Sequence, residues 1–553
     1  MSYSSKVGDG KKVYELNDSQ KSDYKYFENI IDLNYYYNQN FHFFSQFEYT
    51  SPPIIGKYNN DINKAYFEYN NEKYNIKFGD INFLSGYGLS INSYQDHSLD
   101  YDNLLKGIEI NYNINDVFSI RGIKGWDEFN FYSSQAQDSS DLFYDLSSNF
   151  YDIQYNGDLN FFNLNIYSVF YSFQKSKNKY DNSLLDDFAL GYPNKIIAYQ
   201  IESQGNLDNI FLNLNQDYDY KFYTSDYTHT LGFQSSIFSS DLYFEKSFIN
   251  YQKLFNDDYI NGSRLYLSIY KNLMDFDIAY DHINYDSKFQ INNLLSPPTC
   301  MLEVNSVLSS RNDISIDFNN SIGNQIEIRR NLFGFDWLFN TSIYYKKYAH
   351  TESGEITSKD LPSFFNMLRF DVDDYKNYAS KKEFYPKRIV YSELSKWFND
   401  DKFFLKGGFF SYKSLTSVYE VENSATYPFQ YSYNFSGGKS INGYIEYQDR
   451  TKIKNIHENL NKHYNYNTLY NSLSFTFNYD FVFSVFSELE KDQDQIEKKW
   501  SGIELAMRFL GNNNISVFYG SQRGGLICSN GTCAYYPGFE EGFKATLSIN
   551  YDI

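Results

Sequence analysis

The sequence contains no long apolar run. No segment approaches the roughly 20 consecutive apolar residues that a membrane-spanning helix needs, and the mean hydropathy of −0.58 is that of a polar chain. This absence argues against a helical membrane protein. It leaves room for a transmembrane β-barrel, in which only every second residue faces lipid. Signs of helix are also scarce, because alanine is uncommon and sustained 3.6-residue periodicity is hard to find. The composition therefore favours an all-β fold.

Clusters of basic residues are missing as well. The 553 residues carry a formal net charge of −20 at pH 7, and Lys and Arg are scattered along the chain. Nucleic acid is therefore not an expected partner. What is abundant is aromatic residues, with 58 Tyr and 51 Phe against 9 Pro and 5 Met. Tyr near strand ends can form the aromatic girdles of a membrane barrel, although Tyr is also simply a good strand former.

An export signal is also missing from the start of the sequence. The first residues, "MSYSSKVGDGKKVYELNDSQKSDYKYF", have no apolar core of the secretory type. A protein of the bacterial outer membrane needs such a signal. If the protein is one, we expect the given sequence to begin after the cleavage site or at a misplaced start.

Strict alternation of apolar and polar residues is the main positive feature. "RLYLSIYK" places Leu265, Leu267 and Ile269 on one parity, and "GIELAMRF" does the same with Ile503, Leu505 and Met507. The pattern recurs in "GIEINYN" at 107–113, "NIFLNLN" at 209–215 and "SLSFTFNY" at 472–479. Each is typical of a strand with one apolar and one polar face.

The strands of a soluble β-sandwich show the same alternation of apolar and polar residues. The lengths of the connections must therefore distinguish a sandwich from a barrel. Short polar links are expected at 115–116, 156–158, 271–272, 399–401, 437–438 and 511–513, and long polar stretches at 83–103, 126–147, 175–192, 287–300, 348–386, 450–466 and 523–540. Short turns at one end and long loops at the other are typical of an outer-membrane barrel.

The predicted fold is a large antiparallel transmembrane β-barrel with short periplasmic turns and long extracellular loops. We predict about 26 strands (range 24–28), each of about 9–13 residues, the length that crosses a bilayer with tilt. Residues 26–553 form the barrel, after a polar segment at 1–25 in which "KKVYELN" could be a first strand. The region 300–335 is ambiguous.

A barrel of this size encloses a wide interior, because diameter grows with strand number. Loops 83–103 and 348–386 are the candidates for a plug or lid. The second contains the best local helix, "SKDLPSFFNMLRFDVDDYK" at 358–376, in which Asp360 could cap and Pro362 suits an early helical position. A solvated loop with a single helical turn is the alternative.

One stretch near the C-terminus resembles the penultimate loop of an outer-membrane β-barrel family of unknown function from Bacteroidota and related bacteria. That loop has an Arg-Gly-Gly start, two cysteines around a glycine, and a Pro and Gly-Phe before the last strand. The matching residues in "RGGLICSNGTCAYYPGFEEGF" are Arg523, Gly524, Gly525, Cys528, Gly531, Cys533, Pro537, Gly538 and Phe539. Ala534 stands where a basic residue is often expected.

A second stretch resembles the N-terminal part of the same family. Its matching pieces are Pro52-Pro53, Gly79-Asp80 and "GYGL" at 86–89. The two stretches cover a small part of the chain. The resemblance implies location in a bacterial outer membrane and a barrel architecture, and it brings no activity, cofactor or catalytic residue with it.

The last strand matches the signal that the barrel-assembly machinery of such bacteria reads. Resemblance to bacterial barrels implies a terminal aromatic residue with apolar residues at every second position before it. In "FKATLSINYDI" these are Phe543, Ala545, Leu547, Ile549 and Tyr551, while Ile553 departs from the usual Phe.

The cysteines and histidines offer few candidates for chemistry. An Asn-Gly turn between Cys528 and Cys533 could bring them together as a disulfide, with free thiols or a metal site as alternatives. Cys300 is the odd cysteine, and we expect an idle thiol there, with an intermolecular bridge as the alternative. His42 and Ser45 have opposite parity, which argues against a catalytic pair.

Acidic clusters at Asp186-Asp187, Asp257-Asp258 and Asp371 to Asp374 lack the spacing of a calcium loop. We therefore expect no catalytic, cofactor or metal residues, and no enzymatic activity.

Several functions remain open at this stage. The first is an outer-membrane channel or transport-related pore of unknown substrate, in contact with outer-membrane lipid and lipopolysaccharide. The second is a non-conducting scaffold whose loops bind a surface lipoprotein or a secretion partner. A soluble or fibrous extracellular β protein is the third. An energised receptor ranks low, because alternation begins by residue 26 and leaves little room for a plug domain ahead of the barrel.

Overall fold

The computed structural model of the chain describes most of the wall and part of its connections. The described residues are 1–13, 21–54, 59–96, 101–131, 142–161, 164–180, 222–252, 259–287, 294, 296–302, 306–312, 314, 316, 318, 320–346, 387–417, 420–454, 462–478, 480–493, 497–529, 532–536 and 538–551. The expected strand at 209–215, the helix at 358–376 and the acidic clusters at 186–187, 257–258 and 371–374 lie outside them.

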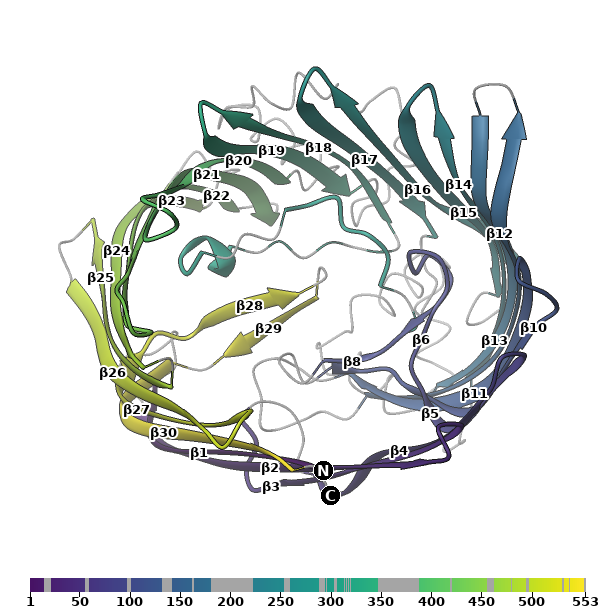
Figure 1. Ribbon diagram of the computed structural model, residues 1–553, viewed down its shortest axis with the longest axis horizontal. Coiled ribbons are helices and arrows are strands. Elements are labelled where there is room, and N and C mark those ends of the chain that lie inside the picture. Colours follow the sequence, from purple (N-terminus) through teal and green to yellow (C-terminus); the bar gives the residue numbers. More distant parts are fainter. Residues whose placement is uncertain are drawn as a thin grey trace, which may run out of the picture.

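The wall of the molecule is one antiparallel sheet of 24 strands that closes on itself, drawn as a ring in Figure 1. The predicted all-β barrel is confirmed, with a strand number at the low end of the predicted range. The wall strands are β1 (Ser2–Val13), β2 (Lys21–Tyr37), β3 (Phe41–Thr50), β4 (Asn60–Asn70), β5 (Tyr74–Ile81), β10 (Leu105–Asn113), β11 (Phe118–Phe131), β12 (Leu142–Phe161), β13 (Leu164–Tyr180), β14 (Phe222–Ile237), β15 (Ser240–Gln252), β16 (Tyr259–Leu273), β17 (Phe276–Asp286), β18 (Asn320–Leu332), β19 (Phe335–Lys346), β20 (Lys387–Phe398), β21 (Phe403–Ser417), β22 (Glu420–Asn434), β23 (Ser440–Lys454), β24 (Lys462–Phe477), β25 (Phe481–Asp492), β26 (Glu497–Phe509), β27 (Asn513–Gln522) and β30 (Gly538–Asn550).

Pairing between the first and last strands closes the ring. β1 lies within the polar segment 1–25 and pairs with both β2 and β30, with Ser4 opposite Ser548. The two chain ends meet, because the Met1 amino group donates to the Tyr551 carbonyl at 3.0 Å and the Tyr551 amide donates back to Met1 at 2.9 Å. Figure 1 shows the N and C ends side by side. Closure removes the free sheet edges, which would otherwise pair with other chains.

The two faces of the wall differ in polarity along each strand. On β23, Ile445 and Tyr447 point outward and are 41% and 42% exposed, whereas Glu446 and Gln448 point inward and are buried. This alternation continues from strand to strand, because side chains of directly paired residues share a face. The outer face is thus largely apolar, and the inner face is polar with many aromatic rings.

Short turns gather at one end of the barrel and long connections at the other. Within the described chain, the short turns include 38–40, 114–117, 274–275, 333–334 and 510–512. Two predicted turns lie a few residues too early. Asn156 to Asp158 form a bulge inside β12, and Lys271-Asn272 lie inside β16. Strand lengths range from 8 residues in β5 to 20 in β12, which is wider than predicted.

Three stretches from the long-connection end turn into the barrel, and we call them the inner segments. The first comprises residues 82–96 and 101–104 and contains β6 (Phe83–Leu84), β7 (Asn92–Ser93), β8 (Gln95–Asp96) and β9 (Tyr101–Asp102). The second comprises the described residues between 294 and 318, with the short 3₁₀ helix η1 (Ser309–Arg311). The third is the hairpin of β28 (Gly525–Ser529) and β29 (Thr532–Tyr536). Figure 1 shows β6, β8, β28 and β29 inside the ring. No helix in the described part of the chain has the length and apolarity of a membrane-spanning segment.

Candidate functional site

The contact region between the inner segments and the inner wall is the candidate site. Charged side chains that are fully buried gather here, and burial of a charge is costly unless hydrogen bonds or ion pairs compensate it. Arg264, Glu245 and Glu446 are each 0% exposed. What these side chains contact therefore defines how the interior is held.

Glu245 on β15 binds the first inner segment through its backbone. The carboxylate accepts hydrogen bonds from the amides of Tyr87 at 2.7 Å and Leu89 at 3.3 Å. It also accepts one from the hydroxyl of Tyr243, at 2.6 Å. Gly86 allows this arrangement, because its φ of +55° is left-handed and a Cβ there would collide with Phe170 and with Glu245 itself. The resemblance stretch "GYGL" is thus a turn that presents two amides to a wall carboxylate.

Glu446 on β23 binds the second inner segment in the same manner. It accepts hydrogen bonds from the amides of Leu308 at 3.1 Å and Ser309 at 3.2 Å, and from the Tyr444 hydroxyl at 2.8 Å. Beside it, Gln448 donates to the Leu308 carbonyl at 3.3 Å. In both places a tyrosine two residues before the glutamate, on the same face, completes the set of donors.

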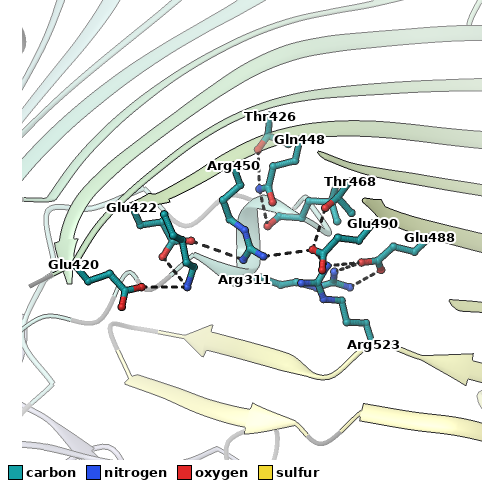
Figure 2. Close-up of polar contacts among 12 residues, drawn as sticks. Arg311, Glu420, Glu422, Thr426, Gln448, Arg450, Thr468, Glu488, Glu490 and Arg523 are labelled. Atoms are coloured by element: carbon teal, nitrogen blue, oxygen red, sulfur yellow. Dashed lines mark hydrogen bonds and ion pairs between the residues drawn. The ribbon is translucent and has the colours of Figure 1, made fainter. Parts of the chain in front are cut away.

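An arginine–glutamate network joins the second and third inner segments to the wall (Figure 2). Arg311 of η1 makes a bidentate contact with Glu488 on β25, at 2.6 and 2.9 Å. Arg523, just before β28, reaches Glu488 at 3.1 Å and Glu490 at 2.6 Å. Such bidentate, charge-assisted contacts are among the strongest polar interactions in proteins.

The network continues along the wall through basic residues of β23. Arg450 lies 3.4 Å from Glu490 and 3.8 Å from Glu422 on β22. Lys452 then contacts Glu422 at 3.5 Å and Glu420 at 3.6 Å. Burial would lower the pKa of Arg523, but Glu490 and Glu488 outweigh that effect and raise it. Each charged side chain of the network therefore has a partner of opposite charge.

Apolar contacts reinforce the polar ones. Leu89 from the first inner segment and Cys300, Met301 and Ile314 from the second share a buried cluster with aromatic and isoleucine side chains of the inner wall. The wall residues are Tyr266, Ile283, Tyr285, Tyr344, Ile389, Tyr391, Phe410 and Tyr412. Burial raises the pKa of the Cys300 thiol well above its usual value. The abundant tyrosines thus also form an inner layer on which the segments pack.

The inner segments also contact one another. The Asn92 amide donates to the Leu294 carbonyl at 2.5 Å, which joins the first segment to the second. Arg264 on β16 lies behind both and donates to the carbonyls of Leu89 at 3.4 Å and Phe318 at 3.3 Å. A Cβ on Gly525 of the third segment would touch the Arg311 side chain at 3.4 Å. The three segments therefore form one connected body.

The residues singled out in the penultimate loop lie at different places. Arg523 belongs to the network, and Gly524 is buried beside it. Phe539, only 1% exposed, packs against Tyr24 and Tyr26 on the inner wall. Gly538 is also buried, and Pro537 and Gly531 lie outside the described residues. Cys528 and Cys533 are opposite each other in the register of β28 and β29.

The residues of the expected assembly signal belong to the closing strand. Phe543, Leu547 and Ile549 lie on the outward parity of β30, and Leu547 pairs with Ile515 and Ser5. Tyr551 follows the strand, and Ile553 lies outside the described residues. His42 stacks on Tyr36 on the inner face, whereas Ser45 has the outward parity.

Sequence reasoning missed the residues that hold the interior. Glu245, Glu446, Glu488 and Arg264 sit on the polar parity of their strands, where they look like ordinary water-facing residues. A Tyr-x-Glu pattern was the available signal, since it occurs as "YFE" at 243–245 and "YIE" at 444–446. Among the described residues, no group of His, Cys, Asp and Glu is arranged to hold a metal ion. The arrangement can bind backbone amides and ion-pair partners, and it can hold loops in place.

Comparison with known structures gives large β-barrels of low sequence identity. The P pilus usher PapC translocation pore covers 100% of this chain and 100% of its own, at 10% identity and a TM-score of 0.43. BauA, the ferric preacinetobactin receptor from Acinetobacter baumannii, covers 99% and 79% at 10% identity and a TM-score of 0.45. The ferric citrate transporter FecA covers 100% and 78% at 8% identity and a TM-score of 0.42. No curated protein matches the chain.

A family model matches the sequence in two separate stretches. They are residues 9–137, which include the first inner segment and Gly86 to Leu89, and residues 390–551, which include Glu446, Glu488 and Arg523. Together these stretches make up more than half of the chain. The chain therefore belongs to the family of unknown function DUF6029.

Proposed function

We propose that this protein is an integral outer-membrane β-barrel whose wide lumen is plugged by its own loops and that it works as a gated pore. The observation that carries this proposal is the apolar outer face of a closed sheet. Outward residues around the ring, such as Ile110, Ile153 and Leu231, are each more than 40% exposed, and no described part of the chain covers them. Lipid tails are the environment that suits such a belt.

The arrangement of the ends supports an orientation in the membrane. Short turns face the periplasm and long loops face the outside in bacterial barrels. The same orientation places the apolar last strand β30 where the assembly machinery would meet it, and places outer-membrane lipid and lipopolysaccharide against the belt. A soluble or fibrous protein would leave these rows of apolar side chains in water, which is unfavourable for so large a surface.

The inner segments give the pore a plug. Residues 82–104 fall in the loop expected to close the lumen, and the second expected plug, 348–386, lies outside the described residues. Plugged lumens are a feature of the largest outer-membrane barrels. In this proposal the loops determine which solute passes and which surface partner binds. Catalysis has no part in this role.

A non-conducting scaffold is the second candidate. The fully buried Glu245 and Glu446 favour it, because they hold the plug by backbone hydrogen bonds that are costly to break. In that case the long loops would bind a surface lipoprotein or a secretion partner while the lumen stays shut.

Purified protein in detergent and in planar bilayers tests both parts of the proposal. We expect heat-modifiable gel mobility, and small or rare conductance events from the wild type. The double variant Glu245→Gln, Glu446→Gln should conduct more, because each carboxylate loses acceptor strength toward two amides. Glu504→Gln, an exposed inner-face residue outside the network, is the control. A variant that stays silent while folded would favour the scaffold, and a protein that does not enter detergent micelles would refute the membrane assignment.

A further inference from the structure

The outer face carries an unusual group of cations at the short-turn end. Lys271 on β16, Arg330 on β18 and Lys396 on β20 have the outward parity of their strands. Each lies two residues before the last residue of its strand, so the three are at the same height on the wall. We call this sector, from β16 to β20, the basic rim.

The spacing of the basic rim is regular. The strands β16, β17, β18, β19 and β20 are consecutive neighbours in the wall, so the cations occupy every second strand. Neighbouring strands lie about 4.8 Å apart, which separates adjacent cations by about 10 Å along the rim. Three separate anionic groups can therefore be contacted at once.

Aromatic rings lie between the cations. The Arg330 guanidinium lies over the ring of Phe276 at 4.1 Å, and Lys396 lies over Phe335 at 4.6 Å and Phe398 at 5.3 Å. Trp337 is the direct neighbour of Arg330 in the register. Rings with adjacent cations are typical of the interface between lipid tails and headgroups.

The cations have no carboxylate partners among the described residues. The polar contacts of Lys271 and Lys396 are with turn carbonyls, those of Phe238 at 3.4 Å and Phe333 at 3.3 Å. The nearest strand acids, Asp277 and Asp336, have the inward parity, and Asp275 lies in the turn itself. The positive charges of the basic rim therefore point outward from the wall, toward the membrane.

The remainder of the rim differs. On the other described wall strands, the outward residues within three positions of a short turn are uncharged, and many are aromatic: Tyr35, Phe41, Tyr69, Tyr74, Tyr112, Phe118, Phe403, Tyr433, Phe477, Phe481 and Phe509 are examples. The chain has a net charge of −20, so this positively charged sector is opposite in sign to the molecule as a whole.

From these observations we infer that the basic rim is a binding site for anionic phospholipid headgroups in the leaflet at the short-turn end. The headgroup phosphates meet Lys271, Arg330 and Lys396, while the acyl chains lie along the outward apolar residues above them. Basic residues next to a membrane attract anionic lipid through this electrostatic term. The inference rests on the proposed membrane location, and it adds a lipid class and a place on the wall.

Lipid retention by the purified full chain tests the inference. The protein in mild detergent is given equal amounts of phosphatidylglycerol and phosphatidylcholine with identical acyl chains, and retained lipid is counted by native mass spectrometry. We expect the wild type to keep more phosphatidylglycerol, and high salt to reduce the difference. The triple variant Lys271→Gln, Arg330→Gln, Lys396→Gln should lose about fivefold or more of the retained anionic lipid, with phosphatidylcholine unchanged.

The matched control removes three outward cations from the opposite end. Lys25, Lys491 and Lys499 are ion-paired there with Asp9 and Glu497, and their change to Gln should leave lipid retention as in the wild type. Equal retention of both lipids by wild type that forms a heat-modifiable barrel would overturn the inference and leave the proposed function standing. Failure of the wild type to enter micelles at all would overturn both.

Discussion

Glutamate residues on the inner wall hold the interior in two ways. Glu245 and Glu446 accept hydrogen bonds from backbone amides, whereas Glu488 and Glu490 accept from arginine side chains. An amide cannot be relocated by a rotamer change, so the first kind of contact fixes the path of the main chain. The second kind tolerates small shifts, because Arg311 and Arg523 share Glu488 and Arg523 also reaches Glu490.

The residue Glu446 provides a direct test of this difference. In Glu446→Ala the amides of Leu308 and Ser309 lose their acceptor, and leaving a buried donor unpaired costs about 1–3 kcal/mol. We expect hydrogen exchange of residues 306–312 to become about tenfold faster or more. Glu504→Ala, on the same inner face of β26, should leave it unchanged. Equal exchange in both variants would show that Glu446 does not hold this segment.

The cysteines make a second prediction at this scale. Cys528 and Cys533 are paired positions in the backbone register of the hairpin, and Cys300 is buried with a raised thiol pKa. Raising the pKa keeps the thiol protonated at mildly alkaline pH, and the thiol form reacts slowly. Maleimide should therefore add nothing to the folded protein, one group after denaturation and three after reduction, as read by intact mass. Three adducts without reduction would refute the predicted disulfide.

The roles of these residues could not be derived from the sequence alone. Glu446, Arg450 and Glu488 lie outside the alternating stretches on which the predicted strands rest, and the structure places them on the inner face. Their partners come from far along the chain, since Leu308 lies 138 residues from Glu446 and Tyr87 lies 158 residues from Glu245. A local pattern holds no information about which distant loop folds against it.

Individual strands were easier to predict than their ends. The periodicity of β16, β24, β26 and β30 is strict, because one face of each is apolar and the other polar. The turn expected at Asn156 to Asp158 is a bulge in β12, where Asn and Gly fit an extra residue as well as a turn. Some strands continue beyond the predicted length, and the count accordingly falls from 26 to 24.

The last strand allows the two faces to be compared with a single side chain. Ala545, near the middle of β30, and Ser548 have opposite parity. Arginine on the lipid face of a barrel costs about 2–4 kcal/mol at the bilayer midplane and less toward its edges. Ala545→Arg should therefore reduce the folded fraction in refolding into lipid vesicles, measured by heat-modifiable mobility, while Ser548→Arg should fold as the wild type. Equal loss in both would contradict the assignment of faces.

At the scale of the whole molecule, the two stretches that match the family are separate in the sequence but adjacent in the barrel wall. Residues 9–137 and 390–551 are far apart in sequence, but the strands they contain become neighbours through the pairing of β1 with β30. They form one uninterrupted side of the barrel. Residues 138–389 supply the other side together with the second inner segment.

Closure of the ring is the feature on which this arrangement depends, and a cross-link can test it. Ser4 on β1 lies directly opposite Ser548 on β30, and directly paired residues have Cβ atoms about 4.5–5.5 Å apart. With the three native cysteines replaced by serine, the variant Ser4→Cys, Ser548→Cys should form a disulfide or react with a short thiol cross-linker, joining the chain ends into a loop of nearly the full length. Its unfolded form should then migrate faster on a non-reducing gel.

The pair Ser4→Cys, Ser474→Cys, with Ser474 on β24, is the control. It should remain open, because strands β25, β26, β27 and β30 lie between β24 and β1. An open result for both pairs would mean that the sheet has free edges, and a sheet with free edges could not present a continuous apolar belt to a membrane.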